Sequence, residues 1–103
     1  MNPEEAISPK SRLEVKKPFI CNTYKEGVSG GYTIARLVYE GRDVIGIRWN
    51  GYKEKDIGFP YSHGHGTWFI LPKEVALAYV ETITTDESII KLVQATDDNP
   101  YER

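Results

Sequence analysis

Two neighbouring stretches in the middle of the chain alternate apolar residues with polar or small ones. Residues 32–40 (YTIARLVYE) and 43–50 (DVIGIRWN) are also rich in β-branched and aromatic residues. A period of two with this composition predicts β-strands. The residues between them, Gly41 and Arg42, predict a two-residue turn that joins the strands into an antiparallel hairpin.

This turn determines the expected faces of the hairpin. A two-residue loop pairs Glu40 with Asp43, and residues two apart along a strand share a face. One face of the hairpin is only half polar, so we expect another part of the chain to cover some of it. The other face should point into the core, because it carries the apolar residues Ile34, Val38, Ile45, Ile47 and Trp49.

Two shorter stretches also predict strands. Residues 18–24 (PFICNTY) have a composition that suits a strand. Residues 67–71 (TWFIL) form an apolar block without alternation, which is typical of a central strand.

The last third of the chain predicts helices. Residues 72–83 begin with a proline and continue with apolar residues at helical spacing. Thr84 and Glu87 have the spacing of a capping box, so we expect a second helix over residues 85–95. The apolar residues at 89–93 also fit a strand, and this alternative stays open.

These elements together predict an α+β fold. We expect a small antiparallel sheet of about three to five strands with one or two C-terminal helices packed on it. Residues 1–17 mix charges with two prolines and predict a flexible N-terminal arm. Residues 18–96 should form the single α+β domain, and residues 97–103 should form a C-terminal tail.

Composition narrows the class of protein. The chain has 103 residues, which suits one domain, and its formal net charge of −2 argues against nucleic-acid binding through a globally basic surface. Cys21 is the only cysteine, which excludes an internal disulfide and a cysteine-rich metal site. No stretch has the apolar core of a signal peptide or the length of a membrane span, so we expect a cytoplasmic protein that does not contact a membrane.

Residues 50–66 (NGYKEKDIGFPYSHGHG) should form a long excursion from the sheet. Loops longer than about 12–15 residues are uncommon in compact domains and are often functional. Tyr52 stands beside Lys53 and Lys55, and aromatic rings beside cations suit base stacking or a protein interface.

Aromatic residues are concentrated in and around this excursion, since six of the chain's twelve lie between positions 49 and 69. We expect Trp49 or Trp68, together with Phe69, to belong to the core. The remaining aromatic rings should cover the core or form a binding surface.

His63 and His65 stand two apart in the same excursion. On an extended backbone their rings and that of Tyr61 would project from one side. Two imidazoles can act as general acid and base, or they can simply hydrogen-bond the backbone of a glycine-rich loop. A metal site needs three or four ligands, and with no cysteine or third histidine nearby we expect neither a metal nor a cofactor.

Arg48 should lie on the half-polar face of the hairpin, beside the small residue Gly46. A guanidinium with small neighbours leaves room for a phosphate or carboxylate. The alternative is a solvated charge at the edge of the sheet or an ion pair with a nearby Asp or Glu.

We therefore expect a small non-catalytic binding module whose surface combines the loop 50–66 with the adjacent sheet face. Its partner would be a protein, a nucleic acid or a nucleotide, and a homodimer remains open. One alternative is a small hydrolase or nuclease in which His63 and His65 are catalytic and act with Arg48. A second alternative is an oligomerising accessory subunit. The residues expected to contact the ligand or partner are Arg48, Tyr52, Lys53, Lys55, Tyr61, His63 and His65.

Overall fold

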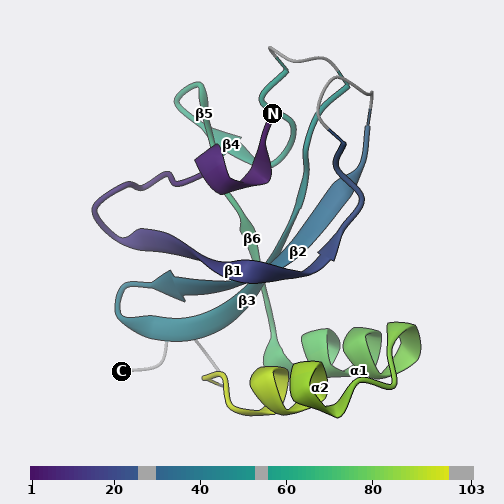
Figure 1. The fold of residues 1–103 in the computed structure, drawn as a ribbon. Helices are drawn as coiled ribbons and strands as arrows, with labels where there is room; N and C mark the ends of the chain where they lie inside the picture. Colours follow the sequence, from purple (N-terminus) through teal and green to yellow (C-terminus); the bar gives the residue numbers. More distant parts are fainter. Residues whose placement is uncertain (26–29, 53–55, 98–103) are drawn as a thin grey trace.

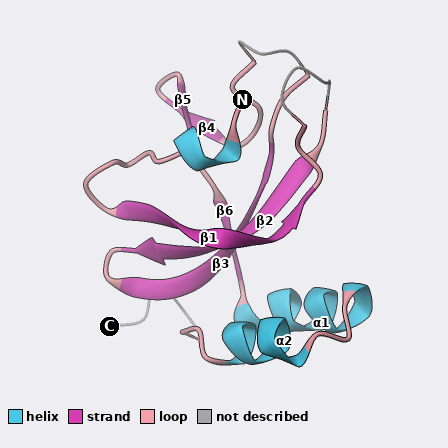
Figure 2. Cartoon of the chain, in the orientation of Figure 1, coloured by secondary structure: helices cyan, strands magenta, loops and turns pink. Residues whose placement is uncertain are grey.

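A four-stranded antiparallel sheet separates two layers of the molecule (Figure 1). The computed structural model describes residues 1–25, 30–52 and 56–97. Both helices lie against one face of the sheet, and an N-terminal 3-10 helix and a two-stranded hairpin, β4–β5, lie over the other (Figure 2). The sheet order is β1-β2-β3-β6, which confirms the α+β class. The elements are η1 (Pro3–Glu5), β1 (Leu13–Asn22), β2 (Tyr32–Tyr39), β3 (Arg42–Trp49), β4 (Tyr61–Ser62), β5 (His65–Gly66), β6 (Phe69–Leu71), α1 (Lys73–Ile83) and α2 (Glu87–Gln94).

The helix-covered face of the sheet holds one of two cores. Ile34 and Ile45 are buried there, as the alternation predicted, and Ile47 is half-buried. Trp49 does not join them, because it is the last residue of β3 and its ring packs edge-on against Tyr32, with 5.8 Å between ring centroids. The helices contribute Ala76, Val80 and Val93 to this core.

The opposite face of the sheet is covered as well, as its half-polar pattern predicted. The indole of Trp68 is buried on this face and donates a 2.7 Å hydrogen bond to the carbonyl oxygen of Ala6. The structure therefore differs from the flexible arm expected over residues 1–17. Ala6 has no exposed surface, and β1 begins at Leu13, because these apolar residues fill the space that the sheet leaves open. This core consists of Ala6, Leu13, Ala35, Leu37, Val44 and Trp68.

The β2–β3 hairpin turns one position earlier than expected. Glu40 and Gly41 occupy the turn with φ of 50° and 79°, and Tyr39 pairs with Arg42. The predicted turn at Gly41 and Arg42 suits a type II′ turn, which needs a positive φ only at the glycine, so turn geometry does not explain the observed position. The observed register shifts the pairing by two residues, which leaves every side chain on its predicted face.

Cross-strand contacts explain the observed register. Ile34 lies opposite Ile47 on the helix-covered face. The guanidinium of Arg36 donates two hydrogen bonds of 2.7 Å to the carboxylate of Asp43. The predicted register would have placed Arg36 opposite Ile47 and lost this bidentate pair.

The two outer strands also differ from expectation. The strand predicted over residues 18–24 begins at Leu13 and ends at Asn22, with an irregular register around Pro18, which has no backbone N–H to donate. The central strand predicted over residues 67–71 is shorter in the structure, where β6 covers only Phe69–Leu71. β6 stands at the end of the sheet order, next to β3. β6 is therefore an edge strand.

Both predicted helices are present, and the strand alternative over residues 89–93 is wrong. The second helix is capped by Asp86 instead of Thr84, because the Asp86 carboxylate accepts a 2.9 Å hydrogen bond from the backbone N–H of Ser88. Of the predicted tail, Asp97 is described, and its carboxylate accepts a hydrogen bond from the backbone N–H of Asp43. Among the described residues, no helix combines the length and apolar character that a membrane crossing requires.

The Asp86 cap should make the stability of α2 depend on pH. Hydrogen bonds from the hydroxyl and backbone N–H of Ser88 hold the pKa of Asp86 below its usual value. A lowered folded-state pKa gives stability that is present above the unfolded-state pKa of about 4 and is lost as pH falls through the folded value. We expect Asp86→Ala to lower the urea midpoint near neutral pH and to have a smaller effect in acid. Asp86→Asn is the control, since its side-chain oxygen still caps and does not titrate. An equal loss from Asp86→Ala at both pH values would contradict this assignment.

Candidate functional site: an aromatic groove

An open groove of about 360 Å³ lies where the end of β3 meets β6 and the segment that precedes β4. Three aromatic side chains on its rim are largely exposed: Trp49 (60%), Phe59 (62%) and Phe69 (59%). Contiguous apolar surface of this kind marks interaction sites on folded proteins. We call this site the aromatic groove. Its lining residues are Tyr32, Ile47, Arg48, Trp49, Phe59, Pro60, Phe69 and Tyr79.

Backbone pairing brings the three exposed rings together. Trp49 and Phe59 form an isolated antiparallel bridge, with N···O distances of 2.7 and 3.0 Å, so the chain returns from its excursion alongside the end of β3. Phe69 lies opposite Ile47 in the β3–β6 pair. The rings therefore come from three separate segments that the sheet holds at one place.

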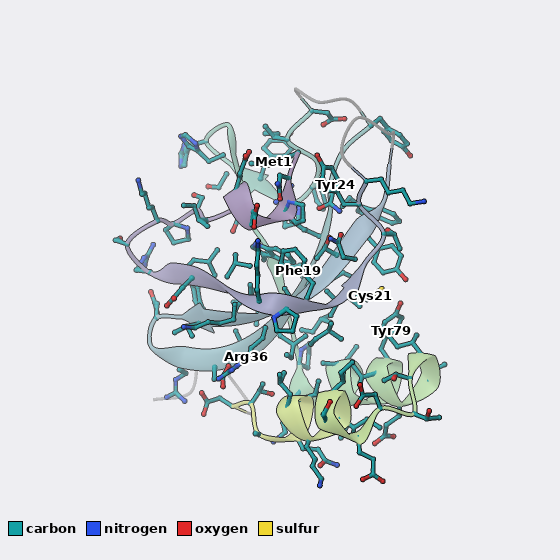
Figure 3. All side chains as sticks on the ribbon, in the orientation of Figure 1. Met1, Phe19, Cys21, Tyr24, Arg36 and Tyr79 are labelled. Carbon is teal, nitrogen blue, oxygen red and sulfur yellow. The ribbon has the colours of Figure 1, made fainter. Side chains whose placement is uncertain are left out.

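Two tyrosines from different layers meet at the helix side of the groove. The hydroxyl oxygens of Tyr32 on β2 and Tyr79 on α1 are 2.5 Å apart. Hydrogen bonding to Tyr79, and secondarily to the thiol of Cys21, raises the pKa of Tyr32. Figure 3 labels Cys21 and Tyr79, and both residues pack against the core on the helix-covered face of the sheet.

The side chain of Arg48 lies in the interior against residues 57–67, which we call the returning segment. It is 1% exposed, and its guanidinium donates hydrogen bonds to the carbonyl oxygens of Ile57 and Thr67. Its guanidinium carbon lies 6.0 Å from the centre of the Trp68 ring. Burial lowers the pKa of Arg48 to about 10. Arg48 thus ties together both ends of the stretch from residue 57 to 67, which includes the groove walls Phe59 and Pro60.

A second polar network fixes the start of the excursion. Asn50 has no exposed surface, and its amide donates a 2.9 Å hydrogen bond to the Thr33 hydroxyl. That hydroxyl donates in turn to the side-chain oxygen of Asn22, at 2.7 Å. Side-chain hydrogen bonds to β2 and, through Thr33, to β1 therefore anchor the position at which the excursion leaves the sheet.

The expected row of Tyr61, His63 and His65 does not form. His63 has a φ of 51° and forms the tip of the β4–β5 hairpin with Gly64, so the segment is not extended through it. Tyr61 packs edge-on against Phe59, with 6.2 Å between ring centroids. Excursion 50–66 therefore contains a small hairpin, where the sequence predicted one long loop.

The other predicted contact residues are dispersed. His65 borders a separate hollow of about 390 Å³ formed with the N-terminal segment. Tyr52 borders another hollow, also of about 390 Å³, which shares Trp49 and Phe59 with the aromatic groove. Lys53 and Lys55 lie outside the described residues. Residues 1–25, 30–52 and 56–97 contain no group of three or more His, Cys, Asp or Glu side chains that could hold a metal ion.

Sequence reasoning missed most of the groove. It assigned Phe69, and in one alternative Trp49, to the core, and it did not single out Phe59, Tyr32 or Tyr79. The density of aromatic residues between positions 49 and 69 was the available signal. It located the region without showing which rings face outward.

Comparison with known proteins finds no match, because no family model fits the chain and no curated protein or solved structure is similar to it.

Proposed function

We propose that this chain is a non-catalytic binding module that holds a segment of a partner protein in the aromatic groove. The observation that carries this proposal is the set of three exposed rings, Trp49, Phe59 and Phe69, on one apolar groove. Tryptophan and aromatic neighbours in such positions contribute much of the binding energy at protein interfaces.

The charge of the groove favours a protein over a nucleic acid. Arg48 is the only charged residue among the described residues that line it, and its terminal N–H groups already bond backbone carbonyls. Base-stacking sites on single-stranded nucleic acids combine their aromatic rings with exposed cations that follow the phosphates. The hydrolase alternative has less support, since these same hydrogen bonds hold Arg48 in the interior and His65 borders a different hollow.

Phe69→Ala should weaken partner binding while the fold remains. The ring is 59% exposed, so its loss removes little buried surface. Tyr52→Ala is the matched control, because Tyr52 is 74% exposed and does not line the groove. We expect Phe69→Ala to weaken binding at least about tenfold, or roughly 1.4 kcal/mol, and Tyr52→Ala to change it little. Affinity capture from a nuclease-treated lysate, quantified for the wild type and both variants, measures this.

Three outcomes would contradict the proposal. Equal capture by the wild type and Phe69→Ala would show that the groove is not the binding surface. A partner lost on nuclease treatment, or with affinity falling steeply between about 50 and 200 mM salt, would favour nucleic acid. Capture solely of further copies of this chain would favour the oligomerising subunit. Thermal unfolding of both variants confirms that they fold.

A further inference from the structure

We infer that the segment held in the aromatic groove is extended and proline-rich. This inference rests on the proposed function, and it goes beyond that function in naming the chemistry of the ligand. It follows from three properties of the lining: its charge, its hydrogen-bonding groups and its shape.

The lining is complementary to a neutral ligand that lacks N–H groups. In the part of the chain that the structure describes, none of the side chains that line the groove is a carboxylate or a carboxamide, so this lining lacks strong side-chain acceptors. An ordinary peptide brings one backbone N–H per residue, and burying an unpaired N–H is costly. Proline has no backbone N–H, so a proline-rich segment avoids that cost.

The polar groups that the lining does offer include donors. The indole of Trp49 carries an N–H and belongs to a largely exposed side chain. Tyr32 and Tyr79 have two hydroxyl hydrogens between them, and their mutual hydrogen bond uses one. When Tyr32 is the donor in that bond, the hydroxyl hydrogen of Tyr79 remains to be donated. A polyproline II segment exposes its backbone carbonyl oxygens, which accept from such donors.

The shape of the lining also suits this ligand. The volume of the groove, about 360 Å³, is near the lower end of the range for ligand-binding sites. Because the groove is also open, it suits a short stretch of polypeptide that lies across it. Aromatic rings such as Trp49, Phe59 and Phe69 form apolar walls for flat pyrrolidine rings. A polyproline II helix is already ordered in solution, so less conformational entropy is lost when it binds.

Selection from a phage-displayed library of random peptides tests the inference without a known partner. The full chain is immobilised, and Phe69→Ala and Tyr52→Ala are selected in parallel. We expect peptides with several prolines to be enriched on the wild type and on Tyr52→Ala, and not on Phe69→Ala. A synthetic peptide of the enriched sequence should bind at least about tenfold more tightly than its version with every proline replaced by alanine. The chemical shift of the Trp49 indole N–H reports binding at the groove.

The outcomes separate this inference from the proposed function. Enrichment of proline-free peptides that need Phe69 would overturn the inference and leave the binding module intact. The same holds if the alanine version binds as tightly as the proline peptide. If no peptide depends on Phe69, both the inference and the proposed function fail.

Discussion

Arg48→Met should lower the free energy of unfolding by roughly 2–4 kcal/mol, because it leaves the carbonyl oxygens of Ile57 and Thr67 without their donor. Each buried polar group that loses its partner costs about 1–3 kcal/mol. These partners belong to the backbone, so no compensating substitution can remove them. Methionine keeps the length and apolar character of the side chain, which limits any contribution from a cavity.

One effect of this substitution acts in the opposite direction. Burial lowers the pKa of Arg48 to about 10, so the folded state disfavours the charged guanidinium. A lowered pKa for a cationic group means that its charge reduces stability at every pH below that value. Removing the charge relieves this penalty, and we therefore place the net loss below the sum for two orphaned carbonyls.

Urea unfolding at neutral pH measures the loss, and Arg48→Lys provides the comparison. An ammonium keeps the charge but lacks the planar fork that reaches two carbonyl groups at once, so lysine should rescue the stability only in part. Both variants should also weaken ligand binding, since Arg48 holds the segment that carries Phe59 and Pro60. Unchanged stability of Arg48→Met would show that the two carbonyl oxygens find other donors. It would also show that the hydrogen bonds from Arg48 are not needed to hold residues 57–67 in place.

Gly58→Ala should be as damaging, with an expected loss of roughly 2–5 kcal/mol. Gly58 has a φ of 70°, where a residue with a Cβ is strained. A Cβ at this position would lie 2.0 Å from the carbonyl oxygen of Trp49 and 2.8 Å from Nη2 of Arg48. The first of these atoms is backbone at the Trp49–Phe59 bridge, so the bridge itself would have to move.

Gly64→Ala separates the clash from the backbone strain. Gly64 has a φ of 79°, but a Cβ there meets no atom within 4 Å. It should therefore show only the cost of the left-handed conformation, about 1–2 kcal/mol. The two variants are compared by urea unfolding and by peptide binding at the groove. Equal losses from both would mean that the returning segment does not pack against Arg48 as described.

Prediction from sequence was most successful where the signal is local. The alternation in β2 and β3 and the helical spacing in α1 depend on residues within one element, and each of these elements formed. The hairpin shows why the faces were also correct although the pairing was not. A shift of two residues preserves the side on which each residue lies, so Ile34 and Ile45 reach the core in either register.

The candidate site was predicted only as a region. The concentration of aromatic residues between positions 49 and 69 located it, but the burial of Trp68 and the exposure of Trp49 depend on what covers each face. The N-terminal segment covers Trp68, and it lies more than sixty residues away in the chain, since Trp68 bonds Ala6. No local pattern records such a contact.

Sequence by itself thus determined the strands of the central hairpin, the side on which each hairpin residue lies and the presence of both helices, because periodicity acts over a few residues. Tertiary structure decided the rest. It placed Arg48 inside, capped by carbonyls from positions 57 and 67, and it assembled the groove from β2, β3, the returning segment, β6 and α1. These outcomes depend on which distant segments share a contact, and that is settled by packing and by the pairing of buried polar groups across the whole chain.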